Sequence, residues 1–287
     1  MNWKRRFCRG CGAACALVAL LACVPGARAV EEPVHILLVG VDGRTEEGRS
    51  RSDAVLLCSF VPGSGRVAMT SFLRDLYLAI PGHGSNRLNA AYAIGGRKLL
   101  RETLQERFGL ELQGCVEVDF EGFPRLIDAL GGVELELRAD EAAHINRSCP
   151  GSSLTQGRRR LNGEQALCFA RIRTLDADGD FSRTRRQQAI LRALLDEWRQ
   201  ADTGELLELA GPVLGMVSTD LSPVQLLGWI FQMAPVLNQL EVSAIQIPVP
   251  GTYRFREVRG MAVLEADWEP NIAALHRFLE KGLPCCA

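Results

Sequence analysis

The chain has 287 residues, 47% of them apolar, so it can bury a sizeable core as one large domain or two small ones. Its first 29 residues carry five basic and no acidic side chains, which leaves 28 basic against 34 acidic residues, a formal net charge of −6, for the rest. An acidic domain of this kind argues against general binding of nucleic acid or other polyanions.

The N-terminal segment, MNWKRRFCRGCGAACALVALLACVPGARA, joins a basic start to a short apolar run. The run at residues 13–24 has twelve residues, whereas a helix that spans a bilayer needs roughly twenty. Small residues at Ala27 and Ala29 fit a cleavage site, so residues 1–29 are predicted to be an export signal peptide. A lipoprotein-type site at Cys23 and a retained N-terminal membrane anchor are the alternatives. All three predict an extracytoplasmic protein, secreted or anchored, at the outer face of the cell membrane or in the cell wall.

The next segments alternate between strand and helix patterns. VHILLVGV (34–41) is a continuous apolar run of strand length, typical of a strand covered on both faces. Residues 53–60 and 66–73 predict two further strands joined by a Pro-Gly turn, and residues 75–80 a short one. A helix is predicted over 89–109, where Gly95 and Gly96 are candidates to interrupt it and Gly109 to end it. Residues 115–120 and 131–137 predict strands around a helix at 120–130.

The second half of the chain begins with a polar stretch at 138–160, predicted to be a loop or an excursion. Residues 162–240 have mostly helical patterns, residues 243–249, 253–258 and 261–266 predict closing strands, and 267–281 a final helix. Because no Pro/Ser-rich linker and no repeat divides the chain, we predict a single domain over 33–284. Its fold class is α/β (α-β-α), a central mixed β-sheet flanked by helices.

Six cysteines follow the N-terminal segment: Cys58, Cys115, Cys149, Cys168, Cys285 and Cys286. None has the spacing of a zinc site, and the four histidines are scattered. Cys149 and Cys168 could form a disulfide in an oxidising compartment, but the sequence alone does not establish any pairing.

Charged residues gather where the predicted strands end. Asp42 and Arg44 directly follow the first strand, and Arg51 and Asp53 stand at the start of the next. If these strands are neighbours, the four side chains meet at one end of the sheet, a usual place for a ligand site. Two aspartates would suit Mg²⁺, which commonly bridges to substrate phosphate. For either motif taken alone, a surface ion pair is the better interpretation.

Two more charged pairs follow along the chain. Arg74 and Asp75 end the third strand. Arg87 and Asn89 stand at the predicted helix start, where free backbone N–H groups also attract anions. A plain helix-capping role is the favoured alternative for Asn89.

The stretch DFSRTRRQQ (180–188) concentrates arginine in the first turns of a predicted helix. At about 100° per residue, Arg183 and Gln187 share one face with Arg186 at its edge, while Arg185 points the opposite way and is excluded. A cation in the first turn opposes the helix dipole, so Arg183 is costly unless an anion binds there. A solvated helix face explains Arg185 well and the other arginines poorly.

Arg171 and Arg173 lie just upstream and align if that segment is extended. Guanidinium groups suit bidentate contacts with phosphate, and several of them beside magnesium suggest a diphosphate. The sequence has no P-loop, no GxGxxG turn and no kinase signature. Since ATP is scarce outside the cytoplasm, a lipid-linked sugar diphosphate is the favoured substrate.

Seven motifs occur in one order over residues 36–191: ILLVGVDGR, RSDAVLL, SFLRDLYLAIPG, RLNAAYAIGG, VDFEGFPRLIDALGGV, LNGEQALCFARIR and GDFSRTRRQQAIL. Together the series closely resembles the LytR-CpsA-Psr phosphotransferase domain. The resemblance implies transfer of a glycopolymer, such as teichoic acid or capsule, from polyprenyl diphosphate to a peptidoglycan hydroxyl, which forms a phosphodiester. It also implies an apolar groove for the polyprenyl chain between the sheet and the helices, and work at the membrane surface.

The same resemblance implies a role for each motif residue. Asp42 and Asp53 would hold Mg²⁺. Catalysis would involve Arg74, Asp75, Arg171, Asp180 and Arg183, with Asp180 orienting the arginines and Asp75 as a base or a positioning group. The diphosphate would be surrounded by Arg44, Arg51, Arg173 and Gln187 as well. Arg87, Asn89 and Arg186 join the diphosphate-binding candidates from their positions at the starts of the predicted helices. Two alternatives share this fold: a non-catalytic protein that binds polyprenyl phosphate or cell-wall polymer, and a polyprenyl-diphosphate-sugar pyrophosphatase.

Overall fold

A computed structural model describes residues 32–43, 51–199 and 203–282 of the chain. The described residues belong to one compact unit, Glu31–Ala287. The predicted export segment 1–29, Arg44, Cys285 and Cys286 lie outside the described residues. Within the described ranges, none of the helices combines the length and the apolar character needed to cross a bilayer.

A six-stranded mixed sheet forms the centre of this unit, in the order β10-β3-β2-β1-β6-β9. Its strands are β1 (Val34–Asp42), β2 (Arg51–Phe60), β3 (Arg66–Phe72), β6 (Gly114–Asp119), β9 (Ser218–Thr219) and β10 (Glu241–Ile247). Strand β1 runs parallel to β6 and antiparallel to β2, which is antiparallel to β3, and β10 runs parallel to β3. The carboxyl ends of β1, β3, β6 and β10 therefore share one edge with the amino end of β2. We call this the carboxyl edge.

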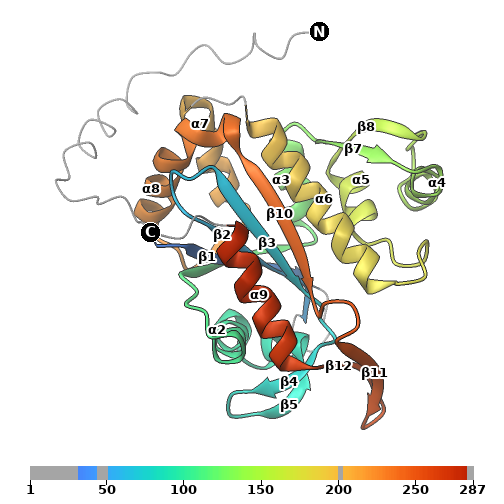
Figure 1. Ribbon diagram of the computed structural model, residues 1–287. Coiled ribbons are helices and arrows are strands. Elements are labelled where there is room, and N and C mark those ends of the chain that lie inside the picture. The colour runs from blue at the N-terminus through green and yellow to red at the C-terminus, as the bar shows by residue number, and fades with distance from the viewer. Residues whose placement is uncertain (1–31, 44–50, 200–202, 283–287) are drawn as a thin grey trace, which may run out of the picture. The chain divides into compact units, whose positions relative to one another are not determined.

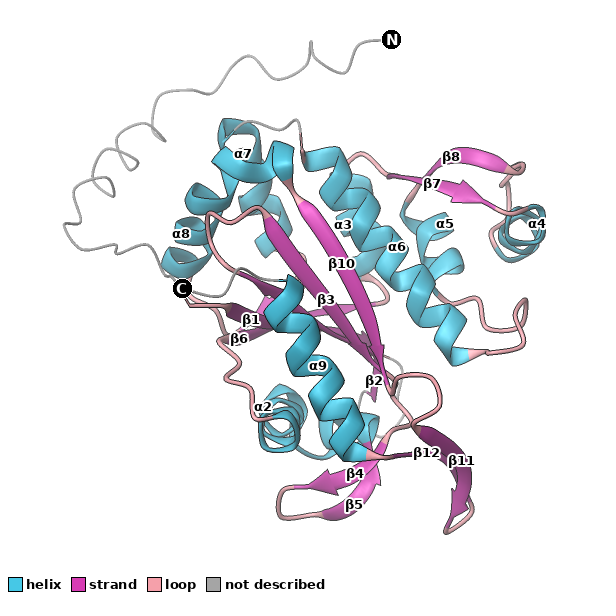
Figure 2. Ribbon diagram, in the orientation of Figure 1, coloured by secondary structure: helices cyan, strands magenta, loops and turns pink. Residues whose placement is uncertain are grey.

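Helices cover both faces of the sheet, as Figures 1 and 2 show. One face packs against α2 (Leu88–Phe108) and α9 (Trp268–Gly282). The other packs against α6 (Asp180–Trp198), α7 (Thr203–Leu214), α8 (Pro223–Met233) and the 3₁₀ helix η2 (Ala234–Gln239). The predicted α-β-α architecture with a central mixed sheet is confirmed.

Strand β1 shows why its sequence forms a buried central strand. Leu37 and Val39 alternate onto the α2 and α9 face, where they are 0% and 1% exposed. Ile36 and Leu38 alternate onto the face of α6, α7 and α8. Because side chains on both faces meet a helical layer, an uninterrupted apolar run is what this position requires.

Glycines shape helix α2 where the sequence predicted them to act. Gly95 and Gly96 leave the helical conformation, with φ of −134° and +63°, so the helix is kinked at this pair. Gly109 caps the helix in the left-handed conformation at φ +64°, where a side chain would be strained. The kink allows the first turns of α2 to stay at the carboxyl edge while the rest of the helix packs on the sheet.

The region after β6 contains α3 (Gly122–Ala129), β7 (Val133–Leu137) and α5 (Gly163–Ala170) around a second apolar core. Residues 138–160, predicted to be a loop or an excursion, are not a plain loop, because α4 (Ala139–Ser148) and β8 (Gly157–Leu161) form there. Strand β8 pairs with β7, and its arginines face Glu134 and Glu197, partners that local periodicity does not reveal. Cys149 and Cys168 form a disulfide that joins the end of α4 to α5.

Two hairpins lie outside the central sheet. The first pairs β4 (Tyr77–Ile80) with β5 (Gly84–Arg87), a strand that the sequence analysis did not predict. The second pairs β11 (Tyr253–Val258) with β12 (Met261–Ala266), which match the predicted closing strands. Figure 1 shows β11 and β12 projecting from the body next to β4 and β5.

Candidate functional site

Arg74 stands at the centre of a set of charged side chains on the carboxyl edge. It leaves the end of β3 and places Nη1 2.5 Å from Asp53 Oδ1 at the start of β2. Its Nε lies 3.2 Å from Asp180 Oδ2 in the first turn of α6 and 3.6 Å from Asp75 Oδ2. The pKa of Arg74 is raised, because the three carboxylates together outweigh the effect of burial.

Two further arginines share the same carboxylates. Arg173 Nε lies 3.4 Å from Asp180 Oδ1, and its Nη2 lies 3.9 Å from Asp53 Oδ1. Arg183 Nη2 lies 3.4 Å from Asp180 Oδ2. We call Arg74, Arg173 and Arg183, together with Asp53 and Asp180, the arginine cluster. It contains three guanidiniums and two carboxylates, so it carries an excess of one positive charge.

Arg183 is the least satisfied member of the arginine cluster. The residue is only 3% exposed, and both Nε and Nη1 are buried without a hydrogen-bond partner among the described residues. Burial lowers the pKa of its guanidinium to about 10. The carboxylate of Asp180 raises this pKa, whereas the positive charges of Arg173 and Arg74 lower it further. Buried donors in proteins are normally paired, so an anion in this place would supply what the chain does not.

Arg87 and Asp75 extend the cluster toward α2. Arg87 Nη1 lies 3.1 Å from Asp75 Oδ1, and Arg87 is also the residue that precedes the first turn of α2. Asn89 is 3% exposed and lies inside the helix, so it does not act as the N-cap. Its backbone N–H donates to the carbonyl of Arg74 at 3.1 Å, which ties the start of α2 to the cluster.

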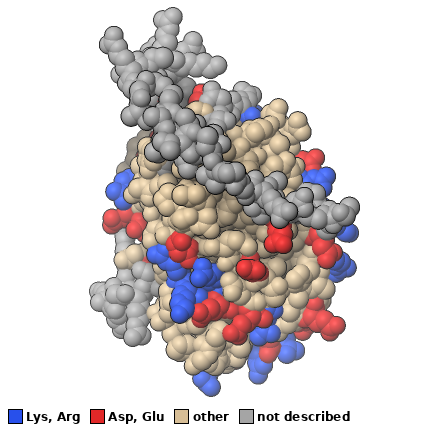
Figure 3. Space-filling view, turned by 90° about the vertical axis from the view of Figure 1, so that its left-hand side faces the viewer, with Lys and Arg blue, Asp and Glu red and all other residues tan. Residues whose placement is uncertain are grey.

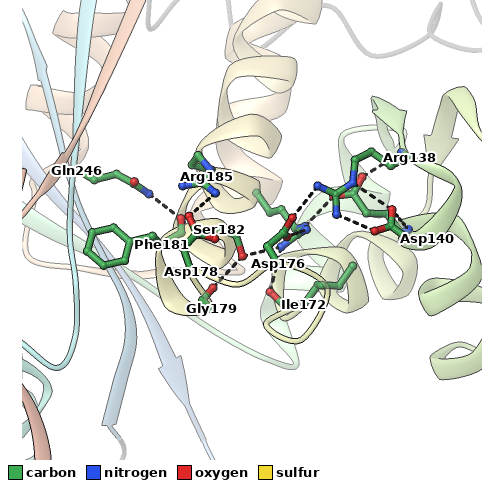
Figure 4. Close-up of polar contacts among 12 residues, drawn as sticks. Arg138, Asp140, Ile172, Asp176, Asp178, Gly179, Phe181, Ser182, Arg185 and Gln246 are labelled. Carbon is green, nitrogen blue, oxygen red and sulfur yellow. Dashed lines mark hydrogen bonds and ion pairs between the residues drawn. The ribbon is translucent and has the colours of Figure 1, made fainter. Parts of the chain in front are cut away.

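Arg186 does not join the arginine cluster, although the helical spacing placed it at the edge of that face. Its Nε donates to Glu141 Oε1 at 2.8 Å, and its Nη2 is bonded to Asp176. Arg138 also bonds Asp176, and Figure 4 shows these contacts to one side of the first turn of α6. Glu141 comes from α4, a helix hidden in the polar stretch, so the sequence did not show this partner, although Asp176 lies only ten residues upstream of Arg186.

The other predicted residues lie around the cluster without entering its ion pairs. The Arg171 guanidinium lies 4.6 Å above the ring of Phe120, just beyond the end of β6 at the carboxyl edge. Gln187 is half-buried on α6, and Arg51 is exposed opposite Asp42. Arg185, which the sequence analysis excluded, is exposed and paired with Asp178.

Gln188 is a positioning residue that the sequence analysis missed. Its Nε2 donates to Ser71 Oγ on β3 at 2.9 Å and to the carbonyl of Ile245 on β10 at 3.0 Å. These bonds fix α6 against the two strands whose ends form the carboxyl edge. Nothing in the sequence separates Gln188 from its neighbour Gln187, since only the tertiary contacts distinguish them.

Asp42 and Asp53 leave neighbouring strands at the carboxyl edge, because Asp42 pairs in register with Arg51. The contacts of Asp53 with Arg74 and Arg173 all use Oδ1. No group of three or more acidic, histidine or cysteine side chains capable of holding a metal occurs among the described residues. Two carboxylates therefore fit magnesium only if substrate phosphate supplies further oxygens, which is its usual mode of binding.

A strip of apolar side chains leads away from the carboxyl edge on the face covered by α7 and α8. Leu38, Ala54, Val116 and Val118 belong to the central strands, yet all four are only half-buried. Helix α8 has no buried residue, although Leu226, Trp229 and Met233 pack toward this face. Figure 3 views the molecule from the left-hand side of Figure 1, where uncharged side chains predominate in the upper part and charged side chains gather in the lower part.

The LytR_cpsA_psr family model matches residues 22–271 of the chain. The chain belongs to the LytR-CpsA-Psr family. The resemblance that the seven motifs carried is thereby confirmed, and the arginine cluster lies in the matched region.

This LytR-CpsA-Psr protein is similar in sequence to two named relatives and in structure to a solved protein of the same family. The chain is 34% identical to Regulatory protein MsrR of Staphylococcus aureus (strain Mu50 / ATCC 700699) over 255 residues, 86% of this chain and 75% of MsrR. It is also 34% identical to the polyisoprenyl-teichoic acid–peptidoglycan teichoic acid transferase TagU of Oceanobacillus iheyensis, over 75% of this chain and 68% of TagU. The structure of the LytR-CPS2A-psr family protein YwtF (TagT) with bound octaprenyl pyrophosphate lipid is similar, with a TM-score of 0.67, 25% identity and coverage of 90% and 93%.

Proposed function

We propose that this protein is a phosphotransferase that moves an anionic glycopolymer from a polyprenyl-diphosphate carrier to a hydroxyl group of peptidoglycan. The observation that carries this proposal is the buried Arg183, whose Nε and Nη1 have no hydrogen-bond partner in the described part of the chain and lie beside two other guanidiniums. A charge held in this way costs stability in the free protein and is explained by a diphosphate that binds there. The name of TagU and the lipid bound to TagT support this substrate class.

In the proposed complex, the arginine cluster holds the diphosphate. Arg74, Arg173 and Arg183 direct their N–H groups at the phosphate oxygens, while Asp53 and Asp180 keep the guanidiniums in place. Charge builds up on the bridging oxygen as the bond to it breaks. Donors fixed in a partly desolvated site stabilise that charge more than water does, because they need little reorganisation.

The transfer step joins an acceptor oxygen to the phosphorus that carries the glycopolymer. The hydroxyl oxygen attacks this phosphorus, the bond to the bridging oxygen breaks, and polyprenyl phosphate leaves. Asp75, held between Arg74 and Arg87, accepts the hydroxyl proton and passes it to solvent. The product is a phosphodiester between glycopolymer and peptidoglycan.

Asp42 and Asp53 would hold Mg²⁺ together with the phosphate oxygens. When bound, the metal would add a second source of positive charge for the leaving phosphate. The polyprenyl chain would lie along the half-buried strip formed by Leu38, Ala54 and Val116, which begins at the carboxyl edge. This arrangement places the lipid tail and the diphosphate on one continuous path.

A lipid-linked donor and a peptidoglycan acceptor require an extracytoplasmic location at the outer face of the membrane, which we propose for this chain. The disulfide between Cys149 and Cys168 supports an oxidising compartment.

The test combines full-length protein, a polyprenyl-diphosphate-linked glycopolymer, magnesium and peptidoglycan fragments. The proposal expects polyprenyl phosphate to be released while labelled polymer becomes attached to the fragments. Both signals should disappear in Arg183→Met. They should persist in Arg185→Met, a matched arginine on the same helix that is exposed and paired with Asp178.

Two other outcomes would replace the proposal. Release of polyprenyl phosphate without any joined acceptor would identify a pyrophosphatase. Tight binding of the donor without turnover would identify a binding protein, a result that would agree with the name of the relative MsrR.

A further inference from the structure

The β11–β12 hairpin is attached to the segment that carries Asp75. The backbone N–H of Leu264 on β12 donates to the carbonyl of Asp75 at 2.9 Å. Leu76 and Leu264 also form an isolated parallel bridge. The hairpin therefore starts beside the residue that the proposed function assigns to the acceptor hydroxyl, and Figure 1 shows it projecting outward from there.

Three aromatic rings connect the start of α6 to the outside of this hairpin. Phe181 stacks on Tyr253, with ring centroids 5.1 Å apart and planes 29° apart. Tyr253 meets Phe255 edge to face at 5.8 Å. Phe181 directly follows Asp180, and its carbonyl accepts a 2.8 Å hydrogen bond from Gln246 Nε2, as Figure 4 shows. The three rings thus run from the arginine cluster to solvent.

Exposure along this row changes from one end to the other. Phe181 is 8% exposed, Tyr253 is half-buried and Phe255 is 77% exposed. Of the four large apolar side chains that are exposed among the described residues, Phe255 is the most exposed. A phenyl ring held edge-on by a neighbour and left in water is suited to contact with a partner.

The charges on the face of the hairpin that carries Phe255 favour a neutral partner, although the exposed Arg259 stands in the turn between β11 and β12. Arg254 and Arg256 lie on the face opposite Phe255, and both pair with Glu265, at 2.6 and 2.9 Å. Glu257 is exposed on the same face as Phe255, where it can accept hydrogen bonds from hydroxyl groups. Since this face presents a carboxylate and no arginine of β11, it does not suit an anionic lipid surface or an anionic polymer.

We propose that Phe255 and Tyr253 form a platform on which a sugar ring of the peptidoglycan acceptor stacks, with Glu257 bonding to its hydroxyls. A sugar presents an apolar C–H face to an aromatic ring and polar groups at its rim, which matches this combination. The inference rests on the proposed function and adds the acceptor subsite to it. The acceptor is favoured over the sugar of the donor because the hairpin is bonded to the chain at Asp75.

The experiment measures transfer by the full chain at several concentrations of a peptidoglycan fragment, with the donor saturating. Phe255→Ala is expected to raise the KM for the fragment roughly 2- to 10-fold, the range of an aromatic contact, with kcat changed less than about twofold. Phe255→Trp should keep the wild-type KM, and Phe255→Leu should resemble Phe255→Ala. Val224→Ala serves as the control, because Val224 is 69% exposed on α8.

An unchanged acceptor KM in Phe255→Ala would overturn the platform, as would a change confined to the donor KM, measured in a second titration of the donor at saturating fragment. If Phe255→Ala lost transfer activity only when the donor is embedded in vesicles, the hairpin would be a membrane contact and not an acceptor subsite. If the wild-type protein transfers nothing, the proposed function fails, and calorimetric binding of the fragment to wild type and to Phe255→Ala then tests the platform separately. Equal binding by both proteins would refute it.

Discussion

Arg183→Met is expected to make the free protein more stable while it abolishes binding of diphosphate. Burial lowers the Arg183 pKa from the ordinary value of an arginine to about 10. Because the pKa of Arg183 is lower in the folded protein than in the unfolded chain, folding disfavours the charged guanidinium. Neutral pH lies below both pKa values, so the full free-energy cost of burying this charge is present there. At about 1.4 kcal/mol per pH unit, this cost is about 3 kcal/mol. Asp180 keeps Arg74 and Arg173 as partners when Arg183 is replaced.

Urea and thermal unfolding measure the effect. We expect the free energy of unfolding to rise by about 1–3 kcal/mol in Arg183→Met, and Tm by about 2–4 °C for each kcal/mol in a domain of this size. Inorganic pyrophosphate should stabilise the wild-type protein, by about 2.7 kcal/mol at a hundred times its Kd, and should leave the variant unchanged.

Arg186→Met is the matched comparison, three residues along the same helix. Arg186 is 5% exposed but its guanidinium is bonded to Glu141 and Asp176, so its removal takes the nearest cation from the buried Glu141 and leaves it only Arg138 at 3.9 Å. We expect a loss of about 3–5 kcal/mol. The reasoning about Arg183 is refuted if Arg183→Met is destabilised as Arg186→Met is, or if pyrophosphate stabilises wild type and Arg183→Met equally.

Three further predictions concern pH, redox state and metal. Burial, with His276 nearby, lowers the pKa of His35 to about 4. As the pH falls, the unfolded chain therefore binds a proton at His35 before the folded protein does. Between pH 6.5 and 4, the free energy of unfolding of the wild type, measured by urea titration, should fall by up to about 3 kcal/mol more than that of His35→Gln. Reduction of the Cys149–Cys168 disulfide should lower the free energy of unfolding by about 3 kcal/mol, which a lower Tm would report. The same reductant should leave the Tm of the double serine variant unchanged. Chelation of magnesium should stop transfer, and Asp42→Asn should raise the magnesium concentration needed for half-maximal transfer; equal requirements would speak against Asp42 as a ligand.

The elements of the central sheet could be predicted because their patterns are local. The apolar run of β1 and the glycines that kink and end α2 express their structure within a few residues. The same holds for the turn between β2 and β3 and for the boundaries of β11 and β12. Where the signal lies in partners far along the chain, prediction failed.

Helix α4 and strand β8 are the clearest failures. Their apolar residues are few, and Ala142 and Ile145 become core only when α3, α5 and α6 close around them. The candidate site shows the same limit. The two buried arginines of α6 look alike in the sequence. They differ in the structure because Glu141 of α4 bonds Arg186, whereas none of the residues that the structure describes bonds Nε or Nη1 of Arg183.

The wide separation of the arginine cluster along the chain has a consequence for biosynthesis. Arg74 and Asp180 stand 106 positions apart, and β2 contributes Asp53 still earlier. A growing polypeptide that ends before α6 has Asp53, Arg74 and Arg173 but lacks Asp180, the carboxylate that all three arginines of the cluster contact. The three guanidiniums can therefore converge only after α6 is made, so affinity for phosphorylated lipids should arise late in synthesis.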